Sequence, residues 1–214
     1  MRAARLPMQN LLLAAVVIGG VSCTALFLNT QTGFPFGLRR WDENVPAHWT
    51  IGCQAGLIMA ATLSLLSARG VAKLLLLPRR GRQDYGYWLL GLSALLGTLP
   101  LSGLDLLATQ VGHWWRWGDH AWIWQEIALP NCAGWLLVHS IALAFATPAL
   151  IDKRPVPSMP GLGPLLGWFA LNAVGIVGCL SHTSDAAVAV LAASVLFATT
   201  LAFHHSCRAS DRCP

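Results

Sequence analysis

The chain carries the stretch Trp88-Leu89-Leu90-Gly91-Leu92-Ser93-Ala94-Leu95-Leu96-Gly97-Thr98-Leu99-Pro100-Leu101-Ser102-Gly103-Leu104, which has no charged residue and ends at Asp105. An apolar run of about 20 residues is long enough to cross a membrane as an α-helix. Similar runs recur along the sequence, so we expect six spans, at roughly 7–28, 49–67, 86–106, 127–150, 162–181 and 186–206. The sequence therefore predicts an all-α, polytopic integral membrane helix bundle that forms one transmembrane domain over residues 1–214.

The composition agrees with this class of protein. Hydrophobic residues make up 55% of the chain and charged residues 11%, whereas soluble chains carry about 25% charged residues. The six cysteines are scattered without a C-x-x-C pattern, so neither a disulfide framework nor a zinc site is expected. Arg2 and Arg5 before an apolar stretch resemble a signal peptide, but the run continues to Leu28, which favours an uncleaved first span.

Lysine and arginine indicate the orientation of the bundle. With alternating sides for successive loops, 11 of the 14 basic residues fall on one side, namely Arg2, Arg5, Arg69, Lys73, Arg79, Arg80, Arg82, Lys153, Arg154, Arg208 and Arg212. The other side holds Arg39, Arg40 and Arg116. The positive-inside rule then predicts that both termini are cytoplasmic. The asymmetry accounts for the net charge of +5, so a nucleic-acid partner is not expected, and the basic face would lie against anionic lipid.

Polar and aromatic residues gather on the opposite face. Five of the ten tryptophans lie between Trp114 and Trp124, and tryptophan favours the boundary between hydrocarbon and water. The acids predicted on this side are Asp42, Glu43, Asp105, Asp119, Glu126 and Asp185, and the histidines are His48, His113, His120 and His182. We therefore expect the functional site at this membrane face.

Two acids in this region are candidates for proton transfer. Asp105 ends the third span, and ionisable groups within a membrane are functional candidates because their burial is costly. Burial would favour the neutral acid, although a solvated helix end is an equally good interpretation. Glu126 precedes the fourth span and is an alternative acid, but a carboxylate there also complements the helix dipole as a simple start signal.

The fourth span places Asn131, Trp135 and His139 on one helical face, because they follow i, i+4, i+8 spacing. Such a face could line a pocket or could provide hydrogen bonds between helices. His113 and His120 stand alone, so no metal site is expected, and no nucleotide or redox motif indicates a cofactor. Close helix approach is predicted at Gly52-x-x-x-Gly56 and Gly163-x-x-x-Gly167.

Two segments together resemble one protein family. The first is Thr32-Gly33-Phe34-Pro35-Phe36-Gly37, and the second runs from Leu104-Asp105 through Gly112, Trp115 and Trp117 to Leu129-Pro130-Asn131 and Gly134-Trp135. They are similar to the T-G-F-P-F-G motif and to the L-D, G-x-W-x-W and V-P-x-N-F-x-G-W pattern of the membrane-bound carotenoid biosynthesis proteins. That family includes γ-carotene 1′,2′-hydratases and bisanhydrobacterioruberin hydratases. The resemblance covers about a third of the chain.

The resemblance implies addition of water to the terminal isopropylidene double bond of a carotenoid, in the cytoplasmic (inner) membrane of a prokaryote. Such a reaction requires a neutral acid, a wall that stabilises a carbocation and a positioned water, but no cofactor. Asp105 or Glu126 would be the acid, and His113 or Asn131 would hold the water. The carbocation would face the rings of Trp115, Trp117 and Trp135, and Phe34 and Phe36 would line the substrate site.

Other functions stay open beside the hydratase. This chain has Leu38-Arg39-Arg40-Trp41 where family members usually have tyrosine after the first motif, and Cys132 where they have phenylalanine. These differences favour a non-catalytic subunit that binds a carotenoid, another polyisoprenoid or a quinone, or that joins a homo-oligomer or a larger membrane complex. A small transporter fits less well, because no charged pair is predicted at mid-membrane.

Overall fold

A computed structural model describes residues 7–118, 122–124, 126–151, 162–180 and 185–210 of the chain. In this part of the chain, six α-helices are joined by short turns and small β-ribbons. The helices are α1 (Met8–Thr32), α2 (Ala47–Leu75), α3 (Tyr85–Leu106), α4 (Leu129–Leu150), α5 (Gly163–Cys179) and α6 (Asp185–Ser210). The shorter elements are η1 (Leu77–Arg79), η2 (Leu107–Val111), β1 (Arg39–Trp41), β2 (Trp115–Trp117), β3 (Ile123–Trp124) and β4 (Ile127–Ala128).

Five of these helices are long and apolar enough to cross a membrane, which confirms the prediction of a multi-pass helical protein. The exception is α5, which is apolar but has only 17 residues. A helix of that length measures about 26 Å, at the short end of what can cross the hydrocarbon core.

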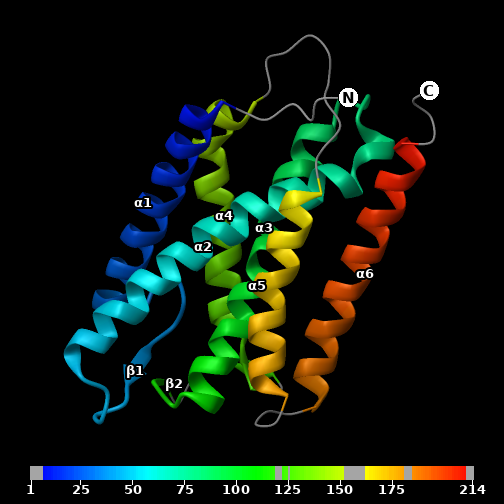
Figure 1. Ribbon diagram of the computed structural model, residues 1–214. Coiled ribbons are helices and arrows are strands. Elements are labelled where there is room, and N and C mark those ends of the chain that lie inside the picture. Colours follow the sequence, from blue (N-terminus) through cyan, green and yellow to red (C-terminus); the bar gives the residue numbers. More distant parts are fainter. Residues whose placement is uncertain (1–6, 119–121, 125, 152–161, 181–184, 211–214) are drawn as a thin grey trace.

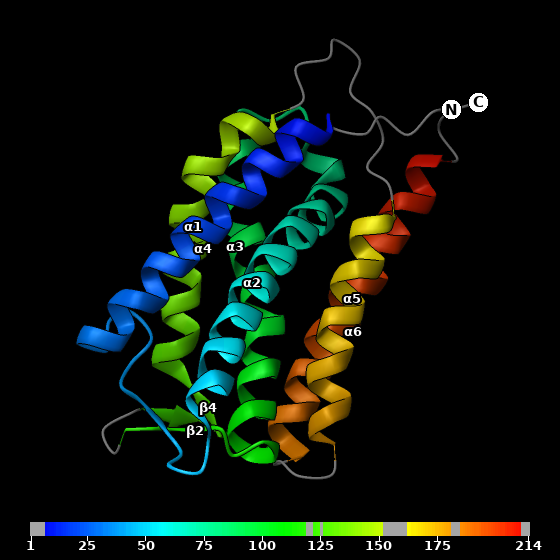
Figure 2. The ribbon, with the colours of Figure 1, turned by 60° about the vertical axis from the view of Figure 1, so that its left-hand side comes forward.

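The helices lie side by side, with alternate directions along the chain (Figures 1 and 2). Helix α2 packs against α3 and α5, α1 packs against α4, and α6 lies against α2 and α5. One end of the bundle carries the first residues of α1 and the last residues of α6, and β1 and β2 lie at the other end (Figure 1).

The described basic residues follow the predicted division between these two ends. The turn between α2 and α3, at the end with the chain's first and last helical residues, holds Arg79, Arg80 and Arg82, and the opposite end holds Arg39, Arg40 and Arg116. Arg2, Arg5, Lys153, Arg154 and Arg212 lie outside the described residues, as do Asp119, His120 and His182. The cytoplasmic location of the termini stays a prediction.

Several helices differ from their predicted bounds. Helix α2 continues to Leu75, past Arg69 and Lys73, where the charges had suggested an earlier end. Helix α1 continues through Thr32 and stops at Gly33, whose φ of 74° is a left-handed conformation that glycine adopts easily. Helix α4 begins at Leu129 because Ile127 and Ala128 pair with β3 instead.

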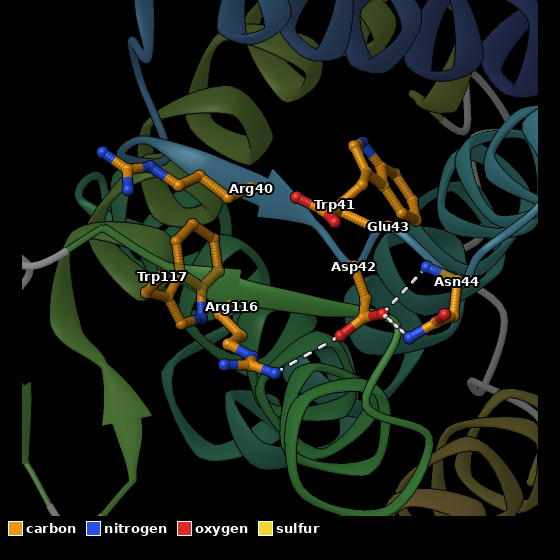
Figure 3. A pocket seen from close by; sticks show the side chains of 7 residues that line it. All are labelled: Arg40, Trp41, Asp42, Glu43, Asn44, Arg116 and Trp117. Atoms are coloured by element: carbon orange, nitrogen blue, oxygen red, sulfur yellow. Dashed lines mark hydrogen bonds and ion pairs between the residues drawn. The ribbon is translucent and has the colours of Figure 1, made fainter.

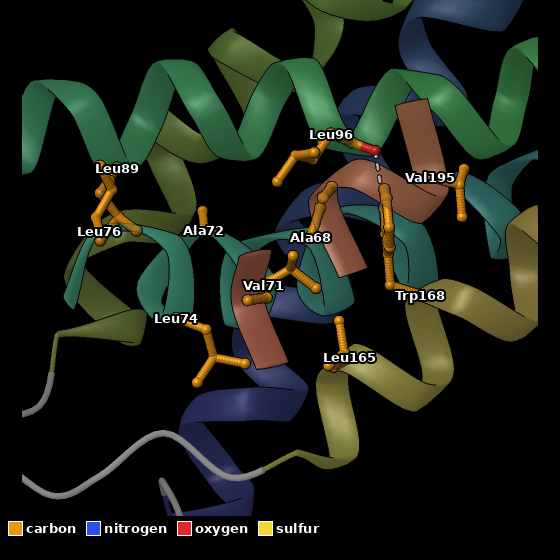
Figure 4. Close-up of a cluster of buried hydrophobic side chains, with 12 residues drawn as sticks. Ala68, Val71, Ala72, Leu74, Leu76, Leu89, Leu96, Leu165, Trp168 and Val195 are labelled. Carbon is orange, nitrogen blue, oxygen red and sulfur yellow. Dashed lines mark hydrogen bonds between the residues drawn. The ribbon is translucent and has the colours of Figure 1, made fainter. Parts of the chain in front are cut away.

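The packing of α2, α3, α5 and α6 is centred on a buried apolar cluster that includes Ala68, Val71, Leu96 and Trp168 (Figure 4). The indole of Trp168 donates a hydrogen bond to the Leu96 carbonyl at 2.9 Å, which fixes α5 against α3.

Of the four glycines predicted to permit close helix approach, one does so, because a Cβ atom at Gly167 of α5 would lie 3.3 Å from Oγ of Ser67 on α2. A Cβ atom at Gly52, Gly56 or Gly163 would meet no atom within 4 Å. The backbones instead approach at Gly103 of α3 and Gly175 of α5, where a Cβ on Gly175 would lie 2.8 Å from the Gly103 backbone. Single glycines on two different helices permit this approach, so a motif within one helix could not reveal it.

Candidate functional site

A two-stranded ribbon joins the loop after α1 to the loop after α3. Strands β1 and β2 are antiparallel, with Arg39 opposite Trp117, Arg40 opposite Arg116 and Trp41 opposite Trp115. Alternate residues of a strand point to opposite faces. One face of the ribbon therefore carries Arg39, Trp41, Trp115 and Trp117, and the other carries Arg40 and Arg116.

The first face covers the carboxyl group of Asp105, at the end of α3. Asp105 is only 4% exposed, so it does not lie at a solvated helix end. The indole nitrogen of Trp115 donates to Oδ1 at 3.1 Å, and that of Trp117 donates to Oδ2 at 3.1 Å. Each carboxyl oxygen thus accepts one indole hydrogen bond, and the two rings hold the carboxyl group in one orientation.

Arg39 places a cation beside this carboxyl group. Its guanidinium carbon lies 4.5 Å from the centroid of the Trp115 ring and 5.2 Å from that of the Trp117 ring. The Nε atom is buried and has no hydrogen-bond partner. Burial lowers the pKa of the Arg39 guanidinium, whereas the negative charge of Asp105 raises it. The ribbon therefore brings a cation, an anion and two indoles into one buried cluster.

The first motif packs against the start of α4. The backbone N–H of Phe36 donates to Oδ1 of Asn29 at 3.1 Å, and the Phe36 ring is buried 4.5 Å from the ring of Trp135. Gly134 makes this contact possible, because a Cβ there would lie 2.7 Å from the carbonyl oxygen of Pro35. The two segments that carry the family resemblance are thus in direct contact.

The polar face predicted for α4 is buried, as expected from its spacing. Asn131 and Trp135 are each 1% exposed and His139 is fully buried. The side chain of Asn131 interacts with the Asp105 carboxyl group, and its own Oδ1 atom is buried without a hydrogen-bond partner. The two ring nitrogens of His139 have no hydrogen bond of regular geometry, but the ring interacts with the backbone of Ala94 on α3, as the interhelical interpretation predicts.

Six of the predicted site residues lie together at this end of the bundle, and we call this group the cap. They are Asp105, Trp115, Trp117, Asn131, Phe36 and Trp135. The other three lie elsewhere. Phe34 is 63% exposed, and His113 is exposed, with Nδ1 against the Thr109 carbonyl at 3.1 Å. Glu126 lies near the Cys179 thiol of α5.

Sequence reasoning missed two members of the cap, Arg39 and Asn29. Arg39 was counted among the basic residues and among the differences from the family motif, but was not predicted as a site residue. Only the structure reveals its place on the ribbon, where Arg39 lies opposite Trp117. Asn29 belonged to the first outer loop in the sequence prediction, whereas it lies in the last turn of α1.

A pocket of about 440 Å³ lies beside the ribbon, and residues from both of its faces line it, including Arg40 and Arg116 from one and Trp41 and Trp117 from the other (Figure 3). Arg116 Nη2 lies 3.3 Å from Asp42 Oδ2, and Asn44 donates to Asp42 Oδ1 through its backbone N–H at 3.0 Å and its side-chain amide at 2.9 Å. These bonds lower the pKa of Asp42, and the bond from the Asn44 backbone has the largest effect. Trp117 lines the pocket and also bonds Asp105, so one indole connects the pocket with the buried carboxyl group.

Among the described residues, no group of three or more His, Cys, Asp or Glu side chains could hold a metal ion. A comparison of the chain with models of known protein families, with curated proteins and with solved structures found no match.

Proposed function

We propose that this protein adds water to the terminal isopropylidene double bond of an acyclic carotenoid. The observation that carries the proposal is the buried carboxyl group of Asp105, which the second family-like segment encloses with the rings of Trp115 and Trp117. This reaction requires an acid next to aromatic rings that can stabilise a carbocation. The resemblance supplies the substrate class, and the geometry supplies the site.

Asp105 can take part in proton transfer while it stays in place. A carboxyl group has about four acceptor positions, and the indoles of Trp115 and Trp117 occupy one position on each oxygen. The Asn131 side chain occupies a third position, so one position is available to a proton. The indole bonds therefore orient the acid without blocking it.

The proposed reaction balances without a cofactor. The Asp105 carboxyl gives its proton to the less substituted carbon of the double bond, whose electron pair forms the new C–H bond. The positive charge on the tertiary carbon then faces a cap ring that Arg39 does not cover, that of Trp135. A water on the unpartnered Oδ1 of Asn131 attacks this carbon, and its excess proton returns to the Asp105 carboxylate.

The location that we propose is the cytoplasmic (inner) membrane of a prokaryote, with both termini in the cytoplasm. The cap would then lie at the outer face, where the end of a long polyene that runs among the helices could reach it. Exposed aromatic side chains near the cap, Trp49, Trp122 and Trp124, suit this interfacial position.

The test is expression of the full chain in a host that accumulates lycopene or γ-carotene, followed by mass analysis of the pigments. The wild-type chain should yield a product heavier by one water, and Asp105→Asn should yield none. Asp84→Asn is a matched control, because Asp84 also accepts an indole bond, from Trp88 at 2.9 Å, but is exposed in the turn before α3. Hydration that persists in Asp105→Asn would refute the role of this acid.

A second candidate function is binding of the carotenoid or another polyisoprenoid without catalysis. The Arg39 cation, buried beside Asp105, favours it, because such a charge pair also suits a rigid cap that only holds a ligand. Unchanged pigment that stays with the folded protein through purification would support this function over the hydratase.

A further inference from the structure

The end of the bundle opposite the cap contains a buried cation that pairs with no carboxylate among the described residues. Arg69, on α2, is only 6% exposed. Its Nε and Nη1 atoms are buried and have no hydrogen-bond partner. In the described part of the chain, no carboxylate forms an ion pair with Arg69.

The position of Arg69 makes it reachable from the lipid headgroups. It lies six residues before the end of α2 at Leu75, which is about 9 Å along the helix axis. Tyr85, the first residue of α3, is half-buried and interacts electrostatically with both Arg69 and Arg80. Both guanidinium groups therefore lie near this phenol, at the end of the bundle that carries the basic turn between α2 and α3.

The residues of helix α2 next to Arg69 are packed tightly against neighbouring helices. Its neighbours Ala68 and Val71 are fully buried in the cluster shown in Figure 4. A Cβ atom at Gly70 would lie 2.7 Å from Cγ of Pro164, so α2 and α5 are in close contact at this level. Helix α2 is thus packed tightly against α5 at the level of Arg69.

A buried guanidinium is costly unless an anion pairs with it. Its planar fork of N–H donors matches the oxygens of a phosphate group. Basic pockets between transmembrane helices are suited to the headgroups of anionic lipids. We propose that Arg69, together with Tyr85 and Arg80, binds the phosphate of an anionic phospholipid in the leaflet at the basic end of the bundle.

The first experiment measures lipid binding by the full chain, purified in a detergent without net charge. Phosphatidylglycerol should bind and raise the unfolding temperature, and Arg69→Gln should weaken that binding about tenfold or more, because charge-assisted hydrogen bonds are lost. Arg82→Gln is the control, since Arg82 belongs to the same basic turn but its side chain is 65% exposed beside Asp84. It should change the binding less than about twofold.

A second measurement separates binding from folding. Without anionic lipid, Arg69→Gln should unfold at a higher temperature than the wild type, because the variant removes an uncompensated buried charge. With phosphatidylglycerol this advantage should shrink or reverse. Equal lipid binding by wild type and Arg69→Gln, or an equal loss in Arg82→Gln, would overturn the proposal. If inorganic phosphate gave the whole effect and phosphatidylglycerol none, the lipid would be ruled out in favour of a free anion.

Discussion

Replacement of Trp115 by phenylalanine tests whether the indole bonds hold the Asp105 carboxyl group. Trp115 is 2% exposed, and its N–H lies 3.1 Å from Asp105 Oδ1. Removal of the indole N–H leaves a buried carboxyl oxygen without its donor, which costs about 1–3 kcal/mol, and the volume lost with the smaller ring adds about 1 kcal/mol. We therefore expect Trp115→Phe to lower the free energy of unfolding by about 2–4 kcal/mol.

The assay is reversible unfolding of the full chain in detergent micelles, followed by far-ultraviolet circular dichroism. Trp88→Phe is the control, because Trp88 donates the same kind of bond to Asp84 but is 51% exposed. Exposure weakens the bond, so the control should change the stability by less than about 0.5 kcal/mol.

A double-mutant cycle links the loss to Asp105 itself. Asp105→Asn turns one acceptor oxygen into an N–H₂ donor, which would face an indole N–H donor. In that background, Trp115→Phe should cost at least about 1 kcal/mol less than in the wild type, since contacting residues couple by about 0.5–3 kcal/mol. A Trp115→Phe stability equal to that of the control, or strict additivity in the cycle, would refute the reasoning.

Three further predictions concern the cap and its orientation. Gly134→Ala should cost about 1–3 kcal/mol of unfolding free energy by calorimetry, because its Cβ would meet Pro35 and Phe36, whereas Gly52→Ala, with no atom within 4 Å, should be neutral or stabilising. Bonds from Asn44 lower the pKa of Asp42. The stability that these bonds give the folded protein should be fully present above the ordinary aspartate pKa and should be lost as the pH falls through the lowered pKa. A carboxyl NMR titration in which the pKa of Asp42 is not lowered would contradict this. Arg116→Cys, at a side chain that is 79% exposed, should react from outside the cell with an impermeant maleimide when the native cysteines are replaced, and labelling only from the cytoplasm would reverse the orientation.

The helical part of the structure was predictable because hydrocarbon imposes long apolar runs. The ends of the helices were less so, as α2 shows. Arg69 and Lys73 suggested an end near residue 67, but arginine can be buried within a bundle when its neighbours are small, and Ala68, Gly70 and Ala72 permit this.

The residue types of the cap could be predicted from the sequence, but the pairing of strand β1 with strand β2 could not. Asp105 and the tryptophans were identified because acids and indoles at a membrane face are uncommon in an apolar chain. Strand β1 has three residues, too few for a period to be recognised, and its partner β2 lies beyond two helices. Phe34 and Phe36 were indistinguishable in sequence, yet the turn at Gly33 and Gly37 exposes the first and buries the second.

The β1–β2 ribbon also constrains the order in which the protein is assembled. Strand β1 is synthesised before α2, and β2 only after α3, so the ribbon can close only once that helical hairpin is in the membrane. Until then Asp105 sits at the end of α3 without its two indole donors, a costly state at the edge of hydrocarbon. Synthesis through Trp117 is thus the step that satisfies this carboxyl group, and it couples formation of the site to completion of the first half of the chain.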